Sequence, residues 1–508
     1  MKILFYVQRI DDAHLAHALA LQMQQDLQAS DFAAINFRRK PECQYLRENA
    51  SLFSNYLSET LMHQKADKRP LSELDADYLD RLEPTYGLPF WHYVTQNRFL
   101  IMKRANYLFE YGTNYSRERL LMHVQTRFQM IEAFLDDFKP DIVVYTGVDV
   151  GPSSALVLEQ VAKARNIPLF VPISTKIGSY HAITDTIYNR VTKIEQRFKE
   201  LESGKLSQNT EQAKDLIAKF KQGQVILPYV DGLELGNFGK KLKLEKLSDK
   251  IKGILFRRID KGLFQKKHGD LYNLSQWEYD LFRLGIEYRN MRLRFGKFFS
   301  KPQKDEKFVF FPFHVEPELA LLLYAPYRIL QSEIAHNVAQ SLPWDTCLYT
   351  KDHPQGIGKK NLGFYKKLVS LPNVKMLYPD LNSHAIISES LGVVTITGTA
   401  AMEAMLLGKP AVTIGEVFFN FAEGLVSRAK SVEDLPELIS EFKDFKPKPD
   451  KLHNFVMAIL DNSVNVDPEG LAKSLMTMPI EEKLTDTSFQ VYAGFLIRNI
   501  KDRLAQRY

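Results

Sequence analysis

The sequence predicts an α/β protein with two Rossmann-like domains, and three observations support this prediction. Short β-branched or aromatic segments alternate with helical segments in the first 190 residues and again after residue 307. At 508 residues, the chain exceeds what one hydrophobic core usually holds together. Its contents of 45% hydrophobic and 25% charged residues are those of a globular protein. We therefore expect two parallel sheets, each covered by helices.

The first domain is predicted over residues 1–190, with a helical insertion. A strand–loop–helix–strand order indicates a parallel sheet, whose ligands lie beyond the carboxyl ends of its strands. Asp149 follows one such strand end and is a candidate site residue, although a helix-capping or loop role fits it equally well. The expected elements are a strand over 2–8, a helix over 14–25, a mostly helical segment over 42–137, a strand over 141–146, a helix from about 153 to 166 and a strand over 167–172.

A helical, basic connecting region is predicted over residues 191–306. Within it, residues 240–267 contain eleven Lys and Arg residues against three acidic ones, a net charge of +8, with leucines and isoleucines between them. Such a segment can lie on an anionic membrane surface or contact a polyanionic substrate. A solvated helix face is the commoner explanation for this pattern. Both interpretations stay open at this point.

The second domain is predicted over residues 307–465 and is organised around the stretch from Leu391 to Gly415. This stretch predicts a strand, a Thr-Gly-Thr turn, a short helix that Gly408 ends, and a second strand. A hydroxyl-rich turn at a helix N-terminus can bind an anion, although an ordinary βαβ packing unit fits the pattern equally well. Residues 466–508 are predicted to form C-terminal helices that pack back on the first domain.

Three polar segments of the second domain each follow a predicted strand, so we expect them to meet at one edge of the sheet. Pro354 should hold His353 in an extended conformation, which presents its ring at the strand end. The three segments are His314-Val315-Glu316-Pro317-Glu318, Lys351-Asp352-His353-Pro354, and Thr397-Gly398-Thr399 with Glu403.

Together these segments provide what the phosphate and ribose of a nucleotide leaving group need. Lys351 and His353 can offer positive charge or hydrogen-bond donors to phosphate. The turn at 397–399 places two hydroxyls beside backbone N–H groups. Glu403, one turn into the following helix, can accept hydrogen bonds from two ribose hydroxyls. A single residue of this kind is weak evidence, and the prediction rests on the combination.

These segments resemble the bacterial capsule-polysaccharide biosynthesis family of glycosyltransferases. The resemblance rests on FVFFPFHVEPE, LYTKDHP and TITGTAAMEAMLLGKPAVTIG, and it covers about residues 307–420, with a looser likeness over 140–174. It implies a GT-B fold, in which two Rossmann-like domains face each other across a cleft and a C-terminal helix crosses back to the first domain. It also implies a nucleotide-sugar donor bound by the second domain and a glycan or lipid-linked glycan acceptor bound by the first. Assigned members of the family include transferases of Kdo from CMP-Kdo.

The resemblance also guides the catalytic assignment. Asp149 is the candidate nucleophile of a retaining enzyme, although its loop does not clearly match the family pattern. His314 and Glu316 are the candidate bases of an inverting enzyme. Phe313 stands where the family often has Leu, which should be harmless. No DxD-type metal motif stands out, so we expect no cofactor and no essential metal.

The leading hypothesis is therefore a glycosyltransferase that builds capsular or surface polysaccharide from a nucleotide-sugar. The mild net charge of +6 does not indicate a nucleic-acid partner. Two distant cysteines favour a reducing cytoplasm, and no apolar run has the length of a membrane span. We expect a cytoplasmic protein, with a possible peripheral contact to the inner membrane through residues 240–267. The alternatives are a CDP-alditol-dependent phosphotransferase of a teichoic-acid-like polymer and a non-catalytic capsule assembly or export factor.

Overall fold

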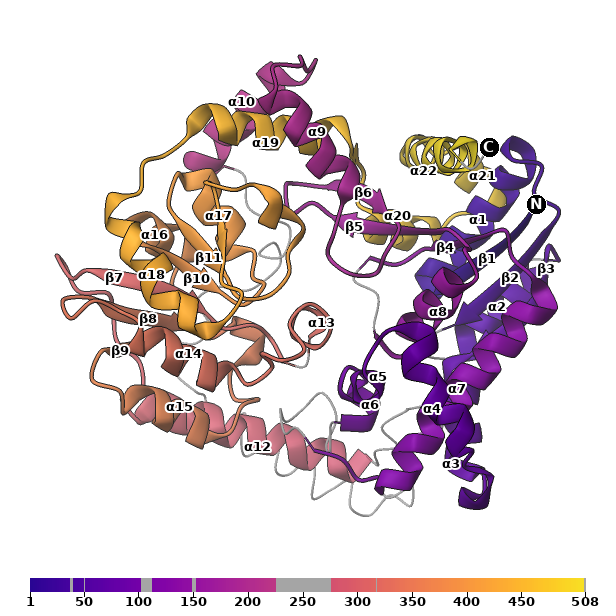
Figure 1. Cartoon of the computed structure of the whole chain (residues 1–508), viewed down its shortest axis with the longest axis horizontal. Helices are drawn as coiled ribbons and strands as arrows, with labels where there is room; N and C mark the ends of the chain where they lie inside the picture. Colours follow the sequence, from indigo (N-terminus) through magenta and orange to yellow (C-terminus); the bar gives the residue numbers. More distant parts are fainter. Residues whose placement is uncertain are drawn as a thin grey trace. The chain divides into compact units, whose positions relative to one another are not determined.

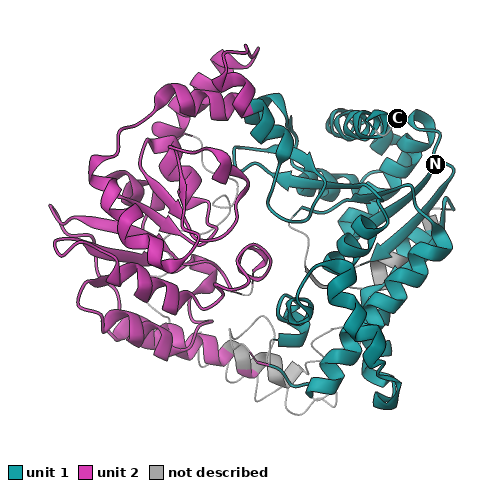
Figure 2. Ribbon diagram, viewed as in Figure 1, with its two compact units in different colours: residues 1–101, 113–197, 458–508 teal, residues 102–112, 198–457 magenta. Residues whose placement is uncertain are grey.

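The computed structural model divides into two compact units, which are described separately. Unit 1 comprises residues 1–101, 113–197 and 458–508, and unit 2 comprises residues 102–112 and 198–457 (Figure 2). The residues whose placement is described are 1–36, 40–49, 51–101, 112–148, 152–224, 276–316 and 318–506. The predicted basic segment 240–267 and Asp149 lie outside these residues.

Unit 1 contains a seven-stranded sheet with helices on its faces, in the strand order β13-β6-β5-β4-β1-β2-β3 (Figure 1). Its elements are β1 (Lys2–Val7), α1 (Ile10–Asp26), β2 (Asp31–Asn36), α2 (Lys40–Asn49), β3 (Phe53–Ser58), α3 (Glu59–Lys68), α4 (Ala76–Tyr86), α5 (Phe90–Thr95), α6 (Arg98–Ile101), α7 (Arg117–Phe138), β4 (Ile142–Tyr145), α8 (Pro152–Ala164), β5 (Leu169–Ser174), β6 (Tyr180–Thr184), β13 (Val464–Asn465), α20 (Pro468–Leu475), α21 (Ile480–Thr485) and α22 (Thr487–Ala505).

The five strands β1 to β5 are parallel, and one edge is completed by β6, which is antiparallel to β5, and by β13, which is antiparallel to β6. The chain builds β2 and β3 on one side of β1 and then returns to build β4 on the other side. The segment predicted to be mostly helical also contains a strand that was not recognised, because residues 53–58 form the parallel strand β3. Only Phe53 and Leu57 of this strand are buried, so its hydrophobic pattern is too weak to distinguish a strand from a helix.

The C-terminal segment of the chain packs into the core of unit 1. Tyr492 and Leu496 of α22 are buried in the same hydrophobic cluster as Phe5 of β1 and Leu19 of α1. Helix α22 therefore covers apolar surface that the first strand and helix of the chain would otherwise expose to water. The change of unit falls within α19 (Pro449–Asp461), after residue 457.

Unit 2 contains a six-stranded, fully parallel sheet in the order β12-β11-β10-β7-β8-β9. Helix α9 (Thr192–Glu202) spans the change of unit after residue 197. The other elements are α10 (Thr210–Lys221), α12 (Gln276–Phe295), β7 (Phe308–Pro312), α13 (Leu319–Leu322), α14 (Gln331–Gln340), β8 (Cys347–Lys351), α15 (Leu362–Val369), β9 (Val374–Leu377), α16 (Ser383–Glu389), β10 (Gly392–Thr395), α17 (Ala400–Leu407), β11 (Ala411–Thr413), β12 (Ser427–Arg428) and α18 (Leu435–Ser440).

The predicted βαβ stretch forms β10, α17 and β11 at the centre of this unit. Gly408 ends α17 in the left-handed conformation, with φ of 73°, and Pro410 precedes the next strand. The predicted α/β fold class is confirmed: the chain has two Rossmann-like units, a helical insertion from α3 to α7 in the first, and a C-terminal segment that returns to it. Among the described residues, no helix is long and apolar enough to cross a membrane.

Candidate functional site

The carboxyl ends of β7 and β10 mark the point in unit 2 where the order of the strands reverses. From β7 the chain adds β8 and β9 on one side, and it then returns to place β10, β11 and β12 on the other. Loops that leave such a point diverge to opposite faces of the sheet and leave a crevice for a ligand. Two of the three predicted site segments leave the sheet here, and the third follows the neighbouring strand β8.

His314 joins the loop after β7 to the turn after β10. Its Nε2 atom lies 3.3 Å from the backbone nitrogen of Thr397, which donates the hydrogen bond. Nε2 is therefore the unprotonated nitrogen, and the proton of the neutral ring sits on Nδ1. Nδ1 lies 3.8 Å from a carboxylate oxygen of Glu318. The ring is nearly buried and holds the turn in place through this pair of contacts.

The turn at Thr397-Gly398-Thr399 is held by several further bonds. The Thr397 hydroxyl donates to the carbonyl of Ala320, and the Thr395 hydroxyl accepts from the backbone N–H of Gly398. A Cβ atom on Gly398 would lie only 2.6 Å from that same Thr395 hydroxyl, so the turn requires glycine. The Thr399 hydroxyl lies 3.5 Å from the carboxylate of Glu403. The donor proton of Thr397 is thus used within the fold, whereas Thr399 contacts another predicted site residue.

Lys351 and Glu403 interact electrostatically, and both have shifted pKa values. Burial lowers the pKa of Lys351 to about 8, against the opposing charges of Glu403 and Asp380. Burial raises the pKa of Glu403 to about 7, against the charge of Lys351. The ammonium of Lys351 also donates to the carbonyl of Leu381 at 2.8 Å. Two ionisable groups that both titrate near neutral pH are typical of a functional site.

His353 has the extended backbone that was predicted from Pro354, with φ of −65° and ψ of 135°. Its Nδ1 atom accepts a hydrogen bond from the backbone N–H of Gln355 at 3.2 Å. The neutral ring therefore carries its proton on Nε2 and can donate to a ligand there. Burial lowers the pKa of His353, so this neutral donor form prevails at pH 7.

A buried carboxylate, Asp352, organises the loop around His353. It accepts from the backbone N–H of His353 at 2.9 Å, from the ammonium of Lys360 at 2.8 Å and from the hydroxyl of Tyr365 at 2.6 Å. Lys360 also reaches the carbonyl of His314 at 3.5 Å. The loops after β7 and β8 therefore share one buried ion pair.

Glu316 lies in the same network, and only 6% of its surface is exposed. Its carboxylate accepts from the side chain of Gln331, which also accepts from the backbone N–H of His314 and donates to the carbonyl of that residue. Burial raises the pKa of Glu316. The hydrogen bonds of Gln331 to His314 and Glu316 therefore hold the loop after β7 in place.

The structure thus brings together His314, Glu316, Lys351, His353, the turn at 397–399 and Glu403 at one edge of unit 2. Asp149 lies outside the described residues. Three supporting residues were not predicted, namely Gln331, Asp352 and Lys360. Asp352 stood within a predicted motif and could have been recognised there, whereas Gln331 and Lys360 follow no pattern that would have indicated them.

Chemically, this edge offers hydrogen-bond donors and one cation next to a carboxylate. The Nε2 proton of His353 and the ammonium of Lys351 can contact an anionic oxygen. Glu403 is an acceptor for hydroxyl groups when it is ionised. Such a set suits a ligand that carries a phosphate and neighbouring hydroxyls.

Two Rossmann-like units in one chain, with a C-terminal segment that returns to the first, are the domain composition of the GT-B fold. Residues 266–435 match the family described as "Capsule polysaccharide biosynthesis protein". The resemblance predicted from the three motifs is confirmed over this region, which contains all of the predicted site residues except Asp149.

Comparisons with individual proteins are more distant. The chain is similar to protein FixF of Sinorhizobium fredii, with 29% identity over 123 residues; the match spans 23% of this chain and only 28% of the length of FixF. Among solved structures, it is similar to a β-Kdo 2,7 transferase of Thermosulfurimonas dismutans KpsC, with 14% identity over 68% of this chain and 81% of that one and a TM-score of 0.31. S. aureus MnaA, solved with UDP, gives 11% identity over 96% and 98% of the two chains and a TM-score of 0.28.

Proposed function

We propose that this protein is a glycosyltransferase of capsular or surface polysaccharide biosynthesis that uses a nucleotide-activated sugar. The observation that carries the proposal is the meeting of the three motif segments at the carboxyl ends of β7, β8 and β10, beside the strand-order reversal of unit 2 and within the region that matches the capsule polysaccharide family. Ligands of open α/β sheets bind at such a point. The residues present there match the needs of a nucleotide phosphate.

In this proposal, Lys351 and His353 bind the phosphate next to the sugar, and Glu403 accepts hydrogen bonds from the ribose. The acceptor oxygen forms a bond to the anomeric carbon while the bond from that carbon to the phosphate oxygen breaks. The nucleotide then leaves with the electron pair of the broken bond. Lys351 stabilises the negative charge that develops on the phosphate, and the Nε2 proton of His353 does so by hydrogen bonding.

The catalytic assignment of Asp149, His314 and Glu316 stays a prediction. The contacts of His314 and Glu316 favour a positioning role in the described state, because the Nε2 atom of His314 and the carboxylate of Glu316 are already hydrogen-bonded within the fold. Asp149 is therefore our first choice for the carboxylate that forms a covalent intermediate or takes the acceptor proton. A base must come within hydrogen-bond reach of that proton in the complex with substrate.

The donor that we propose first is CMP-Kdo, because the family that the motifs resemble includes transferases of Kdo. The acceptor is then a glycan or a lipid-linked glycan. A phosphotransferase that uses a CDP-activated alditol is the second candidate, since its donor presents the same phosphate and ribose to Lys351, His353 and Glu403. A non-catalytic capsule factor is the third candidate, and it requires none of these residues to bind a nucleotide.

Incubation of the purified protein with CMP-Kdo, CDP-glycerol or UDP-sugars, each with a glycan acceptor, tests the proposal. Release of CMP together with transfer of the sugar, both seen by mass spectrometry, is the expected result. Release of CMP with a new phosphodiester in the product would instead establish the phosphotransferase. If calorimetric titrations with CMP, CDP and UDP detect no binding, the non-catalytic role replaces both enzymatic candidates.

Two variants test the proposed binding residues. His353→Ala and Glu403→Ala should each weaken nucleotide binding by about tenfold or more, because each loses a hydrogen bond to a charged or buried group. His336→Ala on α14 and Glu437→Ala on α18 are matched controls, since neither residue belongs to the network described above. Equal nucleotide affinity in all four variants would show that this edge of unit 2 is not the nucleotide site.

A further inference from the structure

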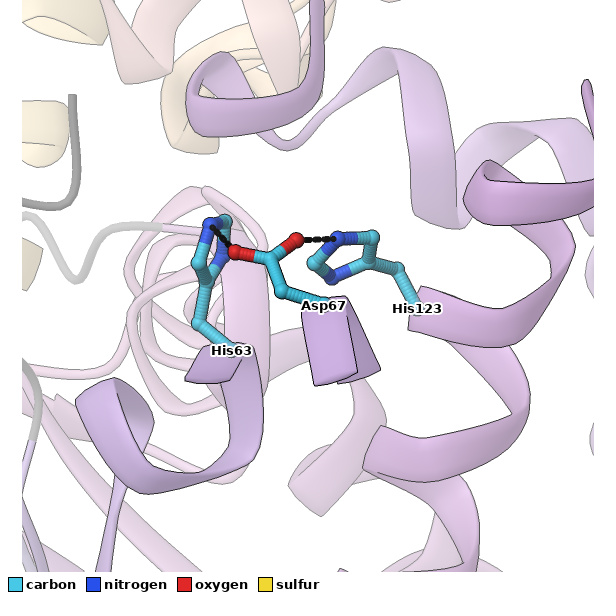
Figure 3. A group of neighbouring side chains, drawn as sticks. All are labelled: His63, Asp67 and His123. Carbon is cyan, nitrogen blue, oxygen red and sulfur yellow. Dashed lines mark hydrogen bonds and ion pairs between the residues drawn. The ribbon is translucent and has the colours of Figure 1, made fainter. Parts of the chain in front are cut away.

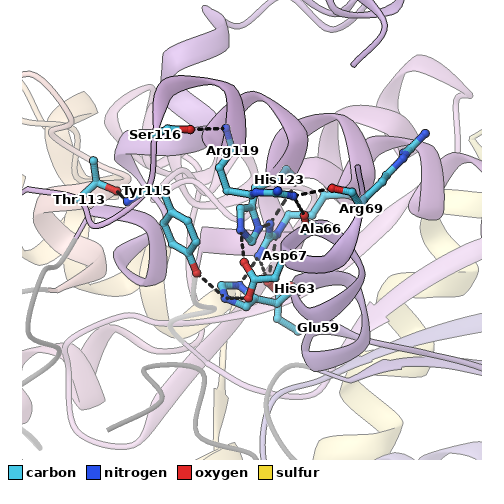
Figure 4. Close-up of polar contacts among 11 residues, drawn as sticks. Glu59, His63, Ala66, Asp67, Arg69, Thr113, Tyr115, Ser116, Arg119 and His123 are labelled. Carbon is cyan, nitrogen blue, oxygen red and sulfur yellow. Dashed lines mark hydrogen bonds and ion pairs between the residues drawn. The ribbon is translucent and has the colours of Figure 1, made fainter. Parts of the chain in front are cut away.

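Helices α3 and α7 of unit 1 face each other with a ladder of polar side chains (Figure 4). On each helix the residues of the ladder are four positions apart, so they lie along one face. Helix α3 contributes Glu59, His63 and Asp67, and helix α7 contributes Arg119, His123 and Arg127. Most of these side chains are buried, and the function proposed above uses none of them.

Within this ladder, His63, Asp67 and His123 point toward one another (Figure 3). The Nε2 atom of His63 lies 3.6 Å from one carboxylate oxygen of Asp67, and the Nε2 atom of His123 lies 2.9 Å from the other. All the potential ligand atoms lie within 4.8 Å of one another. We propose that these three residues bind a divalent transition-metal ion of the Zn²⁺ type, which links α3 to α7.

The three side chains are close enough to gather around one ion. Ligand atoms about 2.0–2.1 Å from a zinc ion are separated from each other by about 3.3 Å in tetrahedral geometry. The Nε2 atoms of His63 and His123 lie 3.6 and 2.9 Å from different oxygens of Asp67, and the candidate ligand atoms lie within 4.8 Å of one another, so the three side chains must draw together to hold the ion. Two imidazoles and one carboxylate are a common zinc ligand set that leaves a fourth position. The hydroxyl of Tyr115, 3.0 Å from the Nε2 atom of His63, lies close enough to fill that position directly or through water.

A metal ion can bind only to unprotonated Nε2 atoms of the two histidines. Contacts with Arg127 decide which nitrogen of each ring carries the proton. Arg127 donates to the Nδ1 atom of His123 at 3.0 Å and to that of His63 at 3.2 Å, which keeps the protons of both rings on Nε2. Metal binding therefore requires each ring proton to move to Nδ1 and Arg127 to turn away. Its alternative partner is already present, because Glu59 accepts from Arg127 through one oxygen only.

The second carboxylate oxygen of Glu59, Oε2, is buried without a hydrogen-bond partner. A buried carboxylate oxygen without a donor is costly. A forked contact of Arg127 with both oxygens of Glu59 through Nε and Nη2 would satisfy Oε2 and release the Nδ1 atom of His63, which Nη2 contacts. Release of His123, which Nη1 contacts, requires the whole guanidinium to shift toward Glu59. In the metal-bound arrangement, the Oε2 atom of Glu59 would thus gain the hydrogen bond that it lacks here.

The ion can reach the site from solvent through Asp67, whose side chain is 39% exposed, whereas both histidines are nearly buried. Asp67 also supplies the negative charge that offsets part of the charge of the ion, since Glu59 neutralises Arg127. The proposal is independent of the proposed function, because the ligands lie in the helical insertion of unit 1.

Calorimetric titration of the EDTA-treated full chain with zinc chloride tests the proposal. We expect one equivalent of Zn²⁺ to bind and to raise the melting temperature. With Co²⁺ as the probe, visible absorption bands typical of tetrahedral coordination should appear. The variants His63→Gln, Asp67→Asn and His123→Gln should each weaken zinc binding by at least about tenfold. His336→Gln on α14 of unit 2 should leave it unchanged.

The double variant Glu59→Gln/Arg127→Met separates a metal site from a hydrogen-bonded cluster. It removes the donors that compete for both Nδ1 atoms and leaves no unpaired charge behind. On the proposal, it binds zinc at least as tightly as the native chain. Loss of zinc binding in this variant, with circular dichroism showing a folded protein, would contradict the tautomer argument. Equal zinc binding by the native chain and His123→Gln would overturn the site itself.

Discussion

The residues that meet at the carboxyl ends of β7, β8 and β10 in unit 2 are called the strand-end cluster. This cluster and the α3–α7 ladder of unit 1 use the same types of residue in different ways. Each is built around a buried ion pair, Asp352 with Lys360 at 2.8 Å and Glu59 with Arg127 at 2.9 Å. Asp352 accepts from three groups through both of its oxygens. Glu59 has one oxygen without a partner. The first cluster is therefore saturated in its described state, whereas the second has room for another arrangement.

The two carboxylates also differ in their position in the secondary structure. Glu59 is the first residue of α3, where the helix dipole stabilises negative charge. Asp352 lies just beyond β8 and depends on its side-chain and loop partners. The comparison suggests that Asp352 and Lys360 exist to hold loops rigidly. In the ladder, in contrast, Glu59 has one carboxylate oxygen that Arg127 does not contact. Loss of a partner should accordingly cost more in unit 2.

The largest predicted effect is that of Asp352→Asn. This change removes the carboxylate that pairs with the buried ammonium of Lys360 and should destabilise unit 2 by about 3–5 kcal/mol. Hydrogen exchange of peptides from unit 2, together with the urea midpoint, would measure the loss. A two-unit chain need not unfold in one step, so the local measurement is required.

The double variant Asp352→Asn/Lys360→Met is the control for this prediction. It removes both charges and keeps an apolar chain of similar length against Phe313 and Phe364, which the lysine contacts. We expect it to recover a substantial part of the lost stability. If the single and double variants were equally unstable, the loss of the Asp352–Lys360 charge pair would not be the cause.

Arg127→Met is predicted to have the next largest effect. It leaves Glu59 buried without its cation, but the N-terminus of α3 still stabilises the carboxylate by about 0.3–1 kcal/mol. The expected loss is therefore somewhat smaller, about 2–4 kcal/mol, and confined to unit 1. Hydrogen exchange of peptides from α3 and α7 is the measurement. A larger loss than that of Asp352→Asn would contradict the comparison of the two clusters.

The difference between the strand-end cluster and the ladder also explains which of the two could be predicted from the sequence. The cluster of unit 2 was largely predictable, because His314, Lys351 and Thr397 each follow a strand and the ends of parallel strands meet. The ladder was not, because its six residues are spread over two helices that are about 50 positions apart in the chain. Their spacing of four is visible on each helix, but only the packing of α3 on α7 turns it into a site.

Tertiary contacts also explain the strand and the ion-pair partner that were not recognised from the sequence. Strand β3 is defined by its parallel pairing with β2, and its own sequence shows little alternation. Lys360 reaches Asp352 from a loop before α15, a contact that no local pattern encodes. The end of α17 was predictable, in contrast, because Gly408 acts through its own backbone conformation.

Gly415→Ala tests the packing behind the Thr397 turn and should have a moderate effect. A Cβ atom here would collide with the Cγ2 atom of Thr397 and lie 2.9 Å from the Cβ atom of Ala325. Overpacking of this kind costs about 1–3 kcal/mol and would shift the turn. We expect weaker nucleotide binding and a lower melting temperature. Gly494→Ala on α22 is the matched control, since its Cβ atom would meet no other atom within 4 Å, and it should be neutral or slightly stabilising.

The smallest predicted effect is a pH dependence of nucleotide binding. With the pKa of Lys351 at about 8, this residue is mostly charged at pH 7 and mostly neutral at pH 9. Raising the pH through 8 therefore removes the cation that binds phosphate, and affinity should fall by up to about tenfold, or about 1.4 kcal/mol. Glu403, with a pKa of about 7, ionises over the lower part of this range and supports the charge of Lys351 there.

Calorimetric titration with CMP at pH 6.5, 7.5, 8.5 and 9.5 measures this dependence. Lys351→Met should bind weakly and show no fall between pH 7.5 and 9.5, because the group that titrates is gone. His353 does not confuse the measurement, since its lowered pKa keeps the ring neutral throughout this range. An affinity in the native chain that stays constant to pH 9.5 would mean that Lys351 does not bind the phosphate. The strand-end cluster would then hold its loops for another ligand.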